Sequence, residues 1–507
     1  MTGGGVPRGR GGTACVWDTG AVTTASSDLP TLDVLRRRAA GLWAALPPEI
    51  GRLADAFAEA GHELALVGGP VRDAFLGRSS ADLDFASSAR PDEIERLLRG
   101  WTKATWDMGR EFGTIGGRRG DLVVEITTYR ADEYDGETRK PVVAFGSSLS
   151  GDLARRDFTV NAMAVRLPSM EFVDPFDGLS DLAGGLLRTP IDPAVSFGDD
   201  PLRMMRAARF ASQLGFEIEP ATFAAMASMA SRIEIVSAER VRDELVKLLL
   251  GTSVREGLAA LVDSGLAAHV LPELPALKLE VDEHHHHKDV YEHTLTVVEQ
   301  AIALETSADG PVPGPDLVLR LASLLHDIGK PPTKRLEPGG GVSFHHHEVV
   351  GAKMAARRLK ALRFDKDTIK AVEHLVFLHL RFHGYADARW SDSAVRRYVV
   401  DAGAGLERLH RLTRADVTTR NKRKADRLSF AYDDLEHRIA ELREQEEVDA
   451  IRPDLDGTQI MEILGIAPGR EVGQAYKHLL ELRMEHGPLG PERAEAELKA
   501  WWESRSE

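Results

Sequence analysis

The sequence predicts an α/β head built on a small mixed sheet, followed by an all-α neck and body, a second all-α domain and a helical tail. Two patterns carry this prediction. Short apolar runs alternate with helical patterns from about Leu32 to Leu187, and from Asp200 onwards apolar residues recur at three- and four-residue spacing. The chain has 507 residues, more than one hydrophobic core usually serves, so several domains are expected.

The strands of the head are indicated by short apolar runs bounded by polar or glycine-rich segments. The helical pattern that begins at Asp289 is interrupted twice, at Pro311–Pro315 and at Pro338–Gly341, where we expect connections between helices. A last helical block follows Pro453–Gly457. The predicted strands are Leu64–Val67, Leu83–Phe85, Leu122–Ile126 and Val160–Val165.

Changes in composition and periodicity suggest where the domains divide. The first residues are rich in glycine, threonine and serine and predict a disordered leader. The expected divisions are a leader at 1–30, the head at 31–188, the neck and body at 189–275, a histidine-rich domain at 276–428 and the tail at 429–507.

Composition excludes several classes of protein. A hydrophobic content of 43% and a charged content of 28% are ordinary for a soluble protein, and no run of roughly 18 apolar residues predicts a membrane span. The N-terminus lacks the apolar segment of a signal peptide, and Cys15 alone cannot form an internal disulfide, which fits the cytoplasm. A net charge of -15 argues against indiscriminate nucleic-acid binding. Local basic patches remain, at Arg36–Arg38, Arg155–Arg156 and Arg420–Lys424.

A glycine turn and two aspartates mark a candidate phosphate site. Gly68 and Gly69 stand between an expected strand and an expected helix, where backbone N–H groups can approach a polyphosphate. Asp82 and Asp84 lie two residues apart in the next strand, so their carboxylates project from one face. Neighbouring carboxylates repel each other unless a divalent cation bridges them. The pattern favours a metal-dependent site, and the alternative is a surface strand with two solvated acids.

Glu125 adds a third acid on a neighbouring expected strand. Together these residues resemble motif A of the class II CCA-adding enzymes and bacterial poly(A) polymerases, in the polymerase-β nucleotidyltransferase superfamily. The resemblance runs from about Leu64 to Leu250 and more loosely to the C-terminus. It implies a polymerase-β-like head in which Asp82 and Asp84 hold two Mg²⁺ ions and Glu125 is a third catalytic carboxylate. It also implies that the triphosphate contacts Gly68, Gly69 and Arg72.

Further segments resemble the other motifs of this family in order. Asp152–Asn161 is similar to motif B, Asp174–Gly178 to motif C, Asp200–Phe210 to motif D and Ser237–Val241 to motif E. Motif D of the family opens with Glu-Asp; here Asp199 takes the first position and keeps the charge. The resemblance implies nucleotide contacts from Arg155, Asp157, Asn161, Asp200, Arg203, Arg206 and Arg209.

Asp200 and Arg203 also have a direct chemical interpretation. Three residues apart on an expected helix, they would share a face. A carboxylate accepts hydrogen bonds and a guanidinium donates them, whereas cytosine and adenine both present an amino donor beside a ring-nitrogen acceptor. The pair therefore predicts selection of C and A without a template. The alternative is an exposed ion pair, which is common on helices.

The choice between CCA addition and poly(A) addition depends on weaker signals. Asp132–Pro141 resembles the flexible loop that complete CCA-adding enzymes need to switch from C to A. The chain is acidic, and its last block has no long basic run of the kind that poly(A) polymerases use for generic RNA. These features favour CCA addition. The alternatives are a poly(A) polymerase and an RNA- or nucleotide-binding regulator with inactive sites.

The histidine-rich domain contains the pair His326-Asp327. Imidazoles and carboxylates from successive helices are the usual way in which helical bundles build metal sites. The domain resembles the HD phosphohydrolase superfamily, and the resemblance implies a divalent transition metal such as Mn²⁺ or Ni²⁺. Its implied core ligands are His293, His326, Asp327 and Asp416. His347 and His379 would complete a larger, dinuclear site.

Several alternatives stay open in this domain. His345 or His346 can replace His347 in the register, and His374 can replace His379. The run His284–His287 predicts a solvated loop, because adjacent imidazoles cannot all face one ion. A bundle that has lost its metal and is kept for structure is the remaining alternative.

The resemblance also implies partners. They are tRNA, held by the helical body and tail, together with ATP and CTP; neither DNA nor a membrane is expected, and the sequence does not indicate an oligomeric state.

Overall fold

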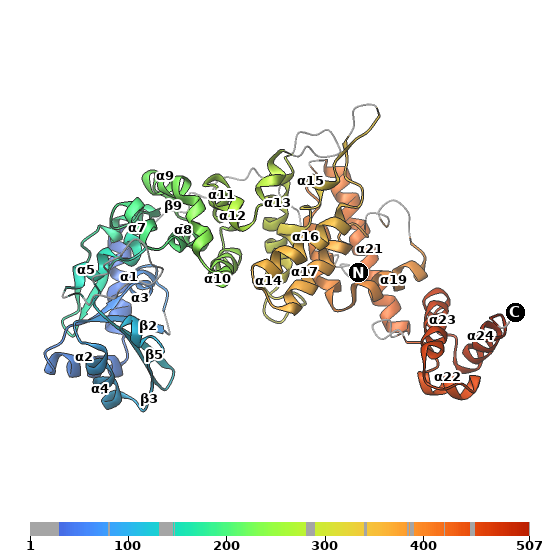
Figure 1. The fold of residues 1–507 in the computed structure, drawn as a ribbon, viewed down its shortest axis with the longest axis horizontal. Helices are drawn as coiled ribbons and strands as arrows, with labels where there is room; N and C mark the ends of the chain where they lie inside the picture. The colour runs from blue at the N-terminus through green and yellow to red at the C-terminus, as the bar shows by residue number, and fades with distance from the viewer. Residues whose placement is uncertain are drawn as a thin grey trace, which may run out of the picture.

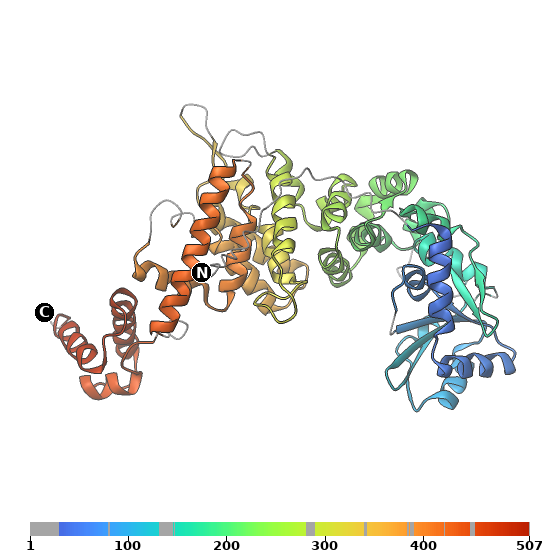
Figure 2. The same cartoon turned by 180° about the vertical axis from the view of Figure 1, so that it is seen from behind.

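The computed structural model describes residues 30–505 apart from 80–81, 131–145, 147, 280–288, 339–341, 383–384, 386–389, 420 and 447–451. The leader before Pro30, the loop Asp132–Pro141 and the run His284–His287 therefore lie outside the described residues. In the described part, the domains follow one another along an elongated molecule, with the head at one end and the tail at the other (Figures 1 and 2). No helix in these ranges combines the length and the apolar character needed to cross a membrane.

A seven-stranded sheet forms the centre of the head, in the order β3-β4-β5-β2-β1-β6-β7. The neighbours β2 and β5 are parallel, and the other neighbouring pairs are antiparallel. The sheet is therefore mixed, as the sequence predicts. Its strands are β1 (Leu64–Val67), β2 (Asp82–Ser87), β3 (Ala104–Trp106), β4 (Thr114–Arg119), β5 (Leu122–Thr128), β6 (Ala164–Leu167) and β7 (Glu171–Val173).

Helices cover the two faces of this sheet unequally. One face, with Leu66 and Phe85, joins the main core. The other, with Val67 and Ala86, meets a smaller cluster that includes Leu153. The main-core side carries α1 (Leu32–Ala44), α2 (Pro48–Glu59), α3 (Gly69–Phe75) and α4 (Pro91–Trp101), and the other side carries the short helix α5 (Leu149–Ala154).

Three of the four predicted strands are confirmed, with β2 three residues and β5 two residues longer than expected. The fourth prediction, Val160–Val165, is wrong over its first half, where Thr159–Asn161 forms a 3-10 turn and strand β6 begins only at Ala164. The reason is local hydrogen bonding. The Asn161 side chain donates to the Asp157 carboxylate, and the Ala162 N–H donates to the Thr159 carbonyl, which closes a turn.

The neck and body are helical except for one short pairing. Strand β8 (Leu186–Leu187) pairs in parallel with β9 (Glu217–Ile218), so the prediction of helix throughout Asp200–Val270 is wrong at β9. Two-residue strands have no periodicity of their own. Strand β9 forms by pairing with a strand that ends 30 residues earlier in the chain, so no local pattern predicts it. The helices are α6 (Gly178–Gly184), α7 (Pro193–Asp199), α8 (Leu202–Leu214), α9 (Pro220–Met229), α10 (Ala238–Leu249), α11 (Val254–Asp263) and α12 (Leu266–Val270).

The histidine-rich domain is a helical bundle with one hairpin. Its helices break between Ala303 and Leu317 and at the hairpin of β10 (Arg335–Leu336) and β11 (Val342–Ser343), which confirms both predicted interruptions. The bundle comprises α13 (Val290–Ala303), α14 (Leu317–Leu325), α15 (Lys330–Thr333), α16 (His347–Ala361), α17 (Lys366–Leu378), α19 (Asp392–Ala402) and α20 (Leu406–Ala415).

One long helix crosses the expected division between the histidine-rich domain and the tail. Helix α21 (Lys422–Glu446) runs through position 428, where the division was expected, and its buried Tyr432 donates to the Thr413 carbonyl of the bundle. A separate small core follows, formed by α22 (Gly457–Leu464), α23 (Arg470–His486) and α24 (Pro491–Glu503). The predicted start after Pro453–Gly457 is confirmed, since Asp456 caps α22 in a capping box with Gln459.

Candidate active sites

The three acids of the head lie on one face of the sheet. In the parallel pairing of β2 with β5, Asp84 is in register with Glu125. Asp82 shares its face because it lies two residues earlier in the same strand. All three side chains are exposed, while the alternate residue Leu83 is buried in the main core. The face is open because α5 covers it only near Ala86. The acids therefore share one solvent-facing surface.

The charges of this surface influence one another. Loss of hydration raises the pKa of Asp84 above its usual range; Arg156 opposes the rise, and the carboxylates of Glu125 and Asp82 add to it. A divalent cation would relieve this repulsion. Among the described residues, however, three ligand atoms within 4.8 Å of one another occur only in the histidine-rich domain. The three acids of the head share a face but do not form such a group.

The turn after β1 requires glycine at one of its two positions. Gly68 has a φ of 72°, and a Cβ atom there would lie 2.7 Å from Nη1 of Arg156. A Cβ at Gly69 would meet only Nη2 of Arg72, at 3.8 Å. Glycine at position 68 thus lets the guanidinium of Arg156, which also pairs with Asp152 at 3.2 Å, approach the backbone of the turn.

Hydrogen bonds join this turn to the motif B segment. Arg72 donates to Oδ1 of Asn161 at 2.7 Å and to Asp73. Asp157 accepts from the Asn161 amide at 2.9 Å and from Nε of Arg206 at 2.7 Å. Burial alone raises the pKa of Asp157, but Arg206 and the hydrogen bonds outweigh it and hold the pKa well below the usual range. The structure therefore brings Arg72, Asn161, Asp157 and Arg206 together, as predicted nucleotide-contacting residues require.

Asp200 and Arg203 are placed differently from the sequence prediction. Asp200 has an extended backbone between α7 and α8, so the two residues do not lie on one helix. Pro201 begins the turn of α8, and the Asp200 carboxylate accepts the Leu202 N–H at 3.1 Å, as a capping residue does. Its other oxygen accepts from Arg240 of α10 at 3.1 Å. The expectation of a shared helical face is therefore wrong.

Arg203 is buried and points toward neighbouring backbone. Its guanidinium donates to Oγ and the carbonyl of Ser196, at 2.8 and 3.2 Å, and to the Arg155 carbonyl at 2.5 Å. These contacts tie α8 to α7 and to the end of α5. The Arg155 side chain itself lies 3.4 Å from Asp152. Arg209 is also buried, with Nε 3.2 Å from the Glu244 carboxylate of α10.

Four histidines of the bundle are held through Nδ1 and turn Nε2 inward. Nδ1 of His326, His347 and His379 bonds to the backbone carbonyl three residues earlier, at 2.8, 2.9 and 2.6 Å. Nδ1 of His293 bonds to Oγ1 of Thr418 at 3.0 Å. Such bonds fix the ring and leave Nε2 as the nitrogen available to bind a metal. The Nε2 atoms of His347 and His379 are buried without a hydrogen-bond partner, as expected of ligands whose partner is an ion.

The ligand atoms form two groups that share a boundary at Asp327. One group is His293, His326 and Asp416, and the other is Asp327, His347 and His379; within each, the atoms lie within 4.8 Å of one another. Oδ2 of Asp327 lies 3.2 Å from His326, and Oδ1 lies 3.4 Å from His347. The carboxylate thus faces both groups, one oxygen to each.

The alternative histidines of this domain lie elsewhere. His345 and His346 are 70% and 82% exposed, and Nε2 of His374 bonds to the Asp401 carbonyl at 2.7 Å. All three lie outside the two groups. Gly329 permits the arrangement, because a Cβ there would lie 2.1 Å from the His347 carbonyl and would push α16 away from the His326-Asp327 turn.

The donor set fits divalent transition metals, which imidazole and carboxylate ligands suit. Burial alone would lower the pKa of His326, but Asp327 and Asp416 raise it to about 10. Burial and the nearby His326 lower the pKa of His379 to about 3, which keeps that ring neutral and able to bind a metal. Lys330 pairs with Asp327 at 2.8 Å, so its ammonium belongs to this cluster.

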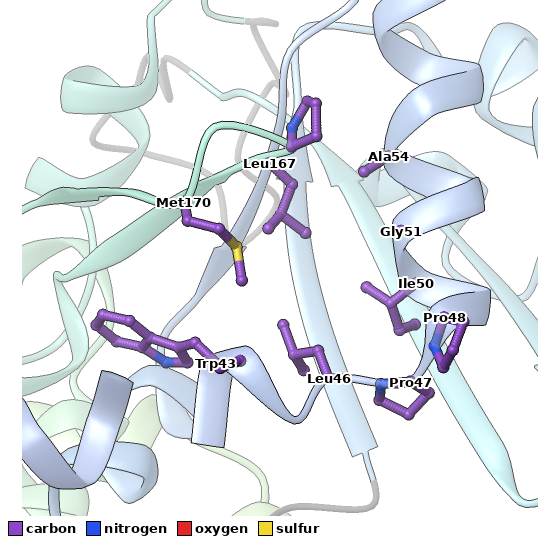
Figure 3. A pocket seen from close by; sticks show the side chains of 11 residues that line it. Trp43, Leu46, Pro47, Pro48, Ile50, Gly51, Ala54, Leu167 and Met170 are labelled. Carbon is purple, nitrogen blue, oxygen red and sulfur yellow. The ribbon is translucent and has the colours of Figure 1, made fainter. Parts of the chain in front are cut away.

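The head also contains an apolar pocket, shown in Figure 3. Its volume is about 240 Å³, and its lining includes Trp43, Ile50, Leu167 and Met170 but no charged residue. Leu167 pairs with Leu64, whose side chain belongs to the main core on the opposite face of the sheet from the acids. The pocket therefore has no part in the phosphate site.

The mixed sheet with its facing acids and glycine turn, followed by a helical neck, defines a nucleotidyltransferase head of the polymerase-β type. Sequence families agree with this class. Residues 64–188 match the family described as Poly A polymerase head domain. Residues 215–277 match the Probable RNA and SrmB- binding site of polymerase A, and residues 290–429 match the HD domain.

Individual relatives extend the match over the chain. The A-adding tRNA nucleotidyltransferase of Deinococcus radiodurans is 35% identical over 450 residues, 87% of this chain and 95% of that protein. The CCA-adding enzyme of Limosilactobacillus fermentum is 45% identical over 212 residues, 42% of this chain and 52% of that enzyme, so this match spans about half of the relative. The chain belongs to the class II tRNA nucleotidyltransferases of bacterial type and carries an HD domain.

Solved structures share the fold. The crystal structure of the Bacillus stearothermophilus CCA-adding enzyme in complex with CTP has a TM-score of 0.64 at 24% identity, over 90% of this chain and 98% of that one. The Thermotoga maritima CCA-adding enzyme complexed with tRNA has a TM-score of 0.58 at 20% identity, over 93% of this chain and 98% of that one.

Two contributors to the head site were missed as site residues by sequence reasoning. Arg156 belongs to a basic patch and to the motif B segment but is not among the predicted nucleotide contacts, yet it faces both Gly68 and the acids. Glu244 carries no motif signal, because its pairing with Arg209 joins helices that are 35 positions apart at these residues. Arg156 was within reach of sequence reasoning, since it lies inside the motif B segment.

Proposed function

We propose that this enzyme adds CCA to the 3′ end of tRNA, using CTP and ATP and releasing pyrophosphate, in the cytoplasm. The observation that carries the proposal is the shared face of Asp82, Asp84 and Glu125 beside the Gly68 turn. Around it stand the guanidinium groups of Arg72 and Arg206, tied to Asn161 and Asp157. An acidic face next to a cationic pocket suits a triphosphate that arrives with divalent cations.

Each group has a role in this proposal. Asp82 and Asp84 would hold two Mg²⁺ ions, and Glu125, opposite Asp84, would orient the RNA 3′-hydroxyl. When bound, the ions offset the charge of the leaving pyrophosphate and make the 3′-hydroxyl a stronger nucleophile. Arg72 and Arg206 neutralise the phosphates. The Asn161 amide and the buried Asp157 fix these two guanidiniums in place.

Base choice is assigned to Asp200 with Arg203. The Asp200 carboxylate is part-exposed. It accepts a hydrogen bond from the amino group of cytosine or adenine once its ion pair with Arg240 has opened. Ser196 and the Arg155 carbonyl hold the guanidinium of the buried Arg203 in place, and we assign its remaining N–H groups as the donors to the base. Rigid donors discriminate well, since guanine and uracil then meet mismatched edges.

The experiment that tests the proposal measures pyrophosphate release with single nucleotides. With tRNA that lacks CCA, CTP alone should support two additions and ATP alone none; with tRNA that ends in CC, ATP alone should support one. GTP and UTP should support none. Release without added tRNA, or from GTP and UTP at rates similar to CTP, would contradict the proposal.

A second candidate is addition of the terminal A alone. The observation that favours it is the Deinococcus radiodurans relative, which is named an A-adding enzyme and matches over 450 residues. In that case CTP supports no addition and only tRNA ending in CC is extended. A poly(A) polymerase, the other alternative, would extend both substrates with ATP for many residues.

We further propose that the HD domain is a metal-dependent phosphohydrolase. The supporting observation is the placement of Asp327, whose two oxygens face separate groups of ligands. His293, His326 and Asp416 would hold one ion, His347 and His379 the other, and Asp327 would bridge them; Mn²⁺ and Ni²⁺ are the expected metals. Metal analysis of the purified protein and hydrolysis of a phosphomonoester with each added metal test this. A folded protein that binds no metal would contradict it.

A further inference from the structure

The ring of Phe210 stands among three arginine side chains. Phe210 lies on α8 and is 5% exposed. The guanidinium carbon of Arg209 lies 4.0 Å from the ring centroid, that of Arg72 lies 5.3 Å away and that of Arg206 lies 5.7 Å away. Arg72 comes from α3, after the glycine turn, whereas Arg206 and Arg209 come from α8. The ring of Phe210 thus lies close to cations from two elements of the head, α3 and α8.

The orientation of the ring is fixed from behind. Phe158 packs edge-on against Phe210, with centroids 5.8 Å apart and planes at 88°. Phe158 is fully buried, and its backbone N–H donates to the Asp157 carboxylate that also binds Arg206. The segment that holds Arg206 by charge therefore also holds the ring against which Arg206 lies.

Gathering three guanidiniums has an electrostatic cost. Each has a carboxylate partner: Asp73 for Arg72, Asp157 for Arg206 and Glu244 for Arg209. Even so, burial together with the charges of Arg206 and Arg72 lowers the pKa of Arg209 to about 10, against the opposing effect of Glu244 and Asp157. The three cations therefore still repel one another.

An aromatic face reduces such repulsion without neutralising the cations. The ring quadrupole attracts a guanidinium within about 6 Å of its centroid. A fourth carboxylate in the same position would instead cancel the charge that a phosphate needs. A ring therefore keeps a cationic cluster both compact and free to bind an anion.

We propose that Phe210 is a positioning residue for the triphosphate. Its ring holds Arg72, Arg206 and Arg209 as one cationic cluster that receives the phosphates of any incoming nucleotide. The inference rests on the proposed function and adds to it a residue that touches no substrate. Because the triphosphate is common to CTP and ATP, Phe210 acts on both nucleotides equally and leaves base choice to Asp200 and Arg203.

The first variant is Phe210→Leu, which keeps the site apolar and removes the quadrupole. Its matched control is Phe216→Leu, because Phe216 is 6% exposed, follows the same helix and has no guanidinium contact within the described residues. The probe is inorganic tripolyphosphate with Mg²⁺, measured by calorimetry on the full-length protein. We expect Phe210→Leu to raise the Kd for tripolyphosphate about tenfold and Phe216→Leu to leave it within twofold.

A second substitution separates electrostatics from packing. Phenylalanine with three ring fluorines at position 210 keeps nearly the same shape and weakens the quadrupole. We expect a Kd intermediate between those of the wild type and Phe210→Leu, with an unchanged thermal unfolding midpoint. In turnover assays, KM for CTP and for ATP should rise by the same factor in both variants, while kcat changes less.

Two results would overturn the inference: an unchanged Kd in the fluorinated protein, or a rise in KM for one nucleotide alone. The first would make Phe210 a packing residue, and the second would make it part of base recognition. Tripolyphosphate binding does not require turnover. A protein that binds it in a Phe210-dependent manner but adds no nucleotide would therefore contradict the proposed function and leave this inference intact.

Discussion

Asp84 and Glu125 are direct neighbours in the parallel pairing of β2 with β5. The carboxylates come from strands that are 41 positions apart at these residues, and the sheet aligns them on an open face with Asp82. That alignment gathers three acids on one surface, where loss of hydration and the neighbouring carboxylates raise the pKa of Asp84 against the opposing effect of Arg156, and bound cations would relieve the repulsion.

Replacement of Asp84 by Asn should abolish nucleotide addition. The change removes a charge needed for the cations and leaves the shape of β2 intact, so we expect activity to fall at least about a hundredfold. Affinity for tRNA, measured by filter binding, should stay within twofold. Asp121→Asn, at an exposed turn on the neighbouring strand pair, is the control and should behave as the wild type. Addition by Asp84→Asn within tenfold of wild type would refute the two-metal assignment.

Asp200→Ala should weaken both correct nucleotides and relax the rejection of GTP and UTP. The carboxylate is the acceptor half of the proposed base contact and is only part-buried, so the fold should tolerate its loss. Competition among the four nucleotides measures this preference. Affinity for tripolyphosphate should not change, in contrast to Phe210→Leu. An unchanged preference would mean that another group recognises the base.

Arg203→Lys should reduce activity and stability together. Lysine cannot reach Ser196 and the Arg155 carbonyl at once, so buried acceptors would lose their donor, at a cost of about 1–3 kcal/mol. Chemical denaturation measures the stability and pyrophosphate release measures the activity. A variant of wild-type stability would show that these hydrogen bonds contribute little to holding α8 against α7.

Deletion of Asp135–Val143 should stall products at CC if the enzyme adds all three nucleotides. The segment resembles the loop used to switch from C to A, whereas C addition depends on the head and on Asp200. Sizing the products on a denaturing gel distinguishes the outcomes. Complete CCA from the deletion variant would show that this segment is not the switching loop.

Asp327→Ala should empty the HD domain of metal and spare nucleotide addition. Asp327 faces both ligand groups, and no residue of the head contributes to either. Circular dichroism establishes that the bundle is folded before metal content and phosphomonoester hydrolysis are measured. His345→Ala is the control, since His345 is 70% exposed outside the groups. Loss of nucleotide addition in the folded Asp327→Ala protein would contradict the independence of the two sites.

Much of the fold and of the candidate sites could be predicted because the signals are local. The run Leu64–Val67 is a strand with the predicted ends. The spacing of Asp82 and Asp84 fixes a shared face whatever the rest of the sheet does. In the HD domain, family matching selected the same six side chains that the structure brings together.

The predictions that failed involve contacts between distant segments. Asp200 leaves the helix because Pro201 begins α8, and its partner Arg240 lies 40 residues away. The pairing of β8 with β9 has no local pattern, because its two strands lie in separate stretches of the chain. Periodicity identifies elements, but it does not specify which of them pack together.

The most direct test of CCA addition is sequencing of tRNA 3′ ends after incubation with the enzyme, Mg²⁺, ATP and CTP. Two substrates are required, one lacking CCA and one ending in CC. We predict that both substrates finish as CCA, with no longer products and no incorporation of G or U from a mixture of all four nucleotides. Extension of the CC-ended substrate alone would establish A addition instead, and ends carrying long runs of A, or no added nucleotides, would contradict it.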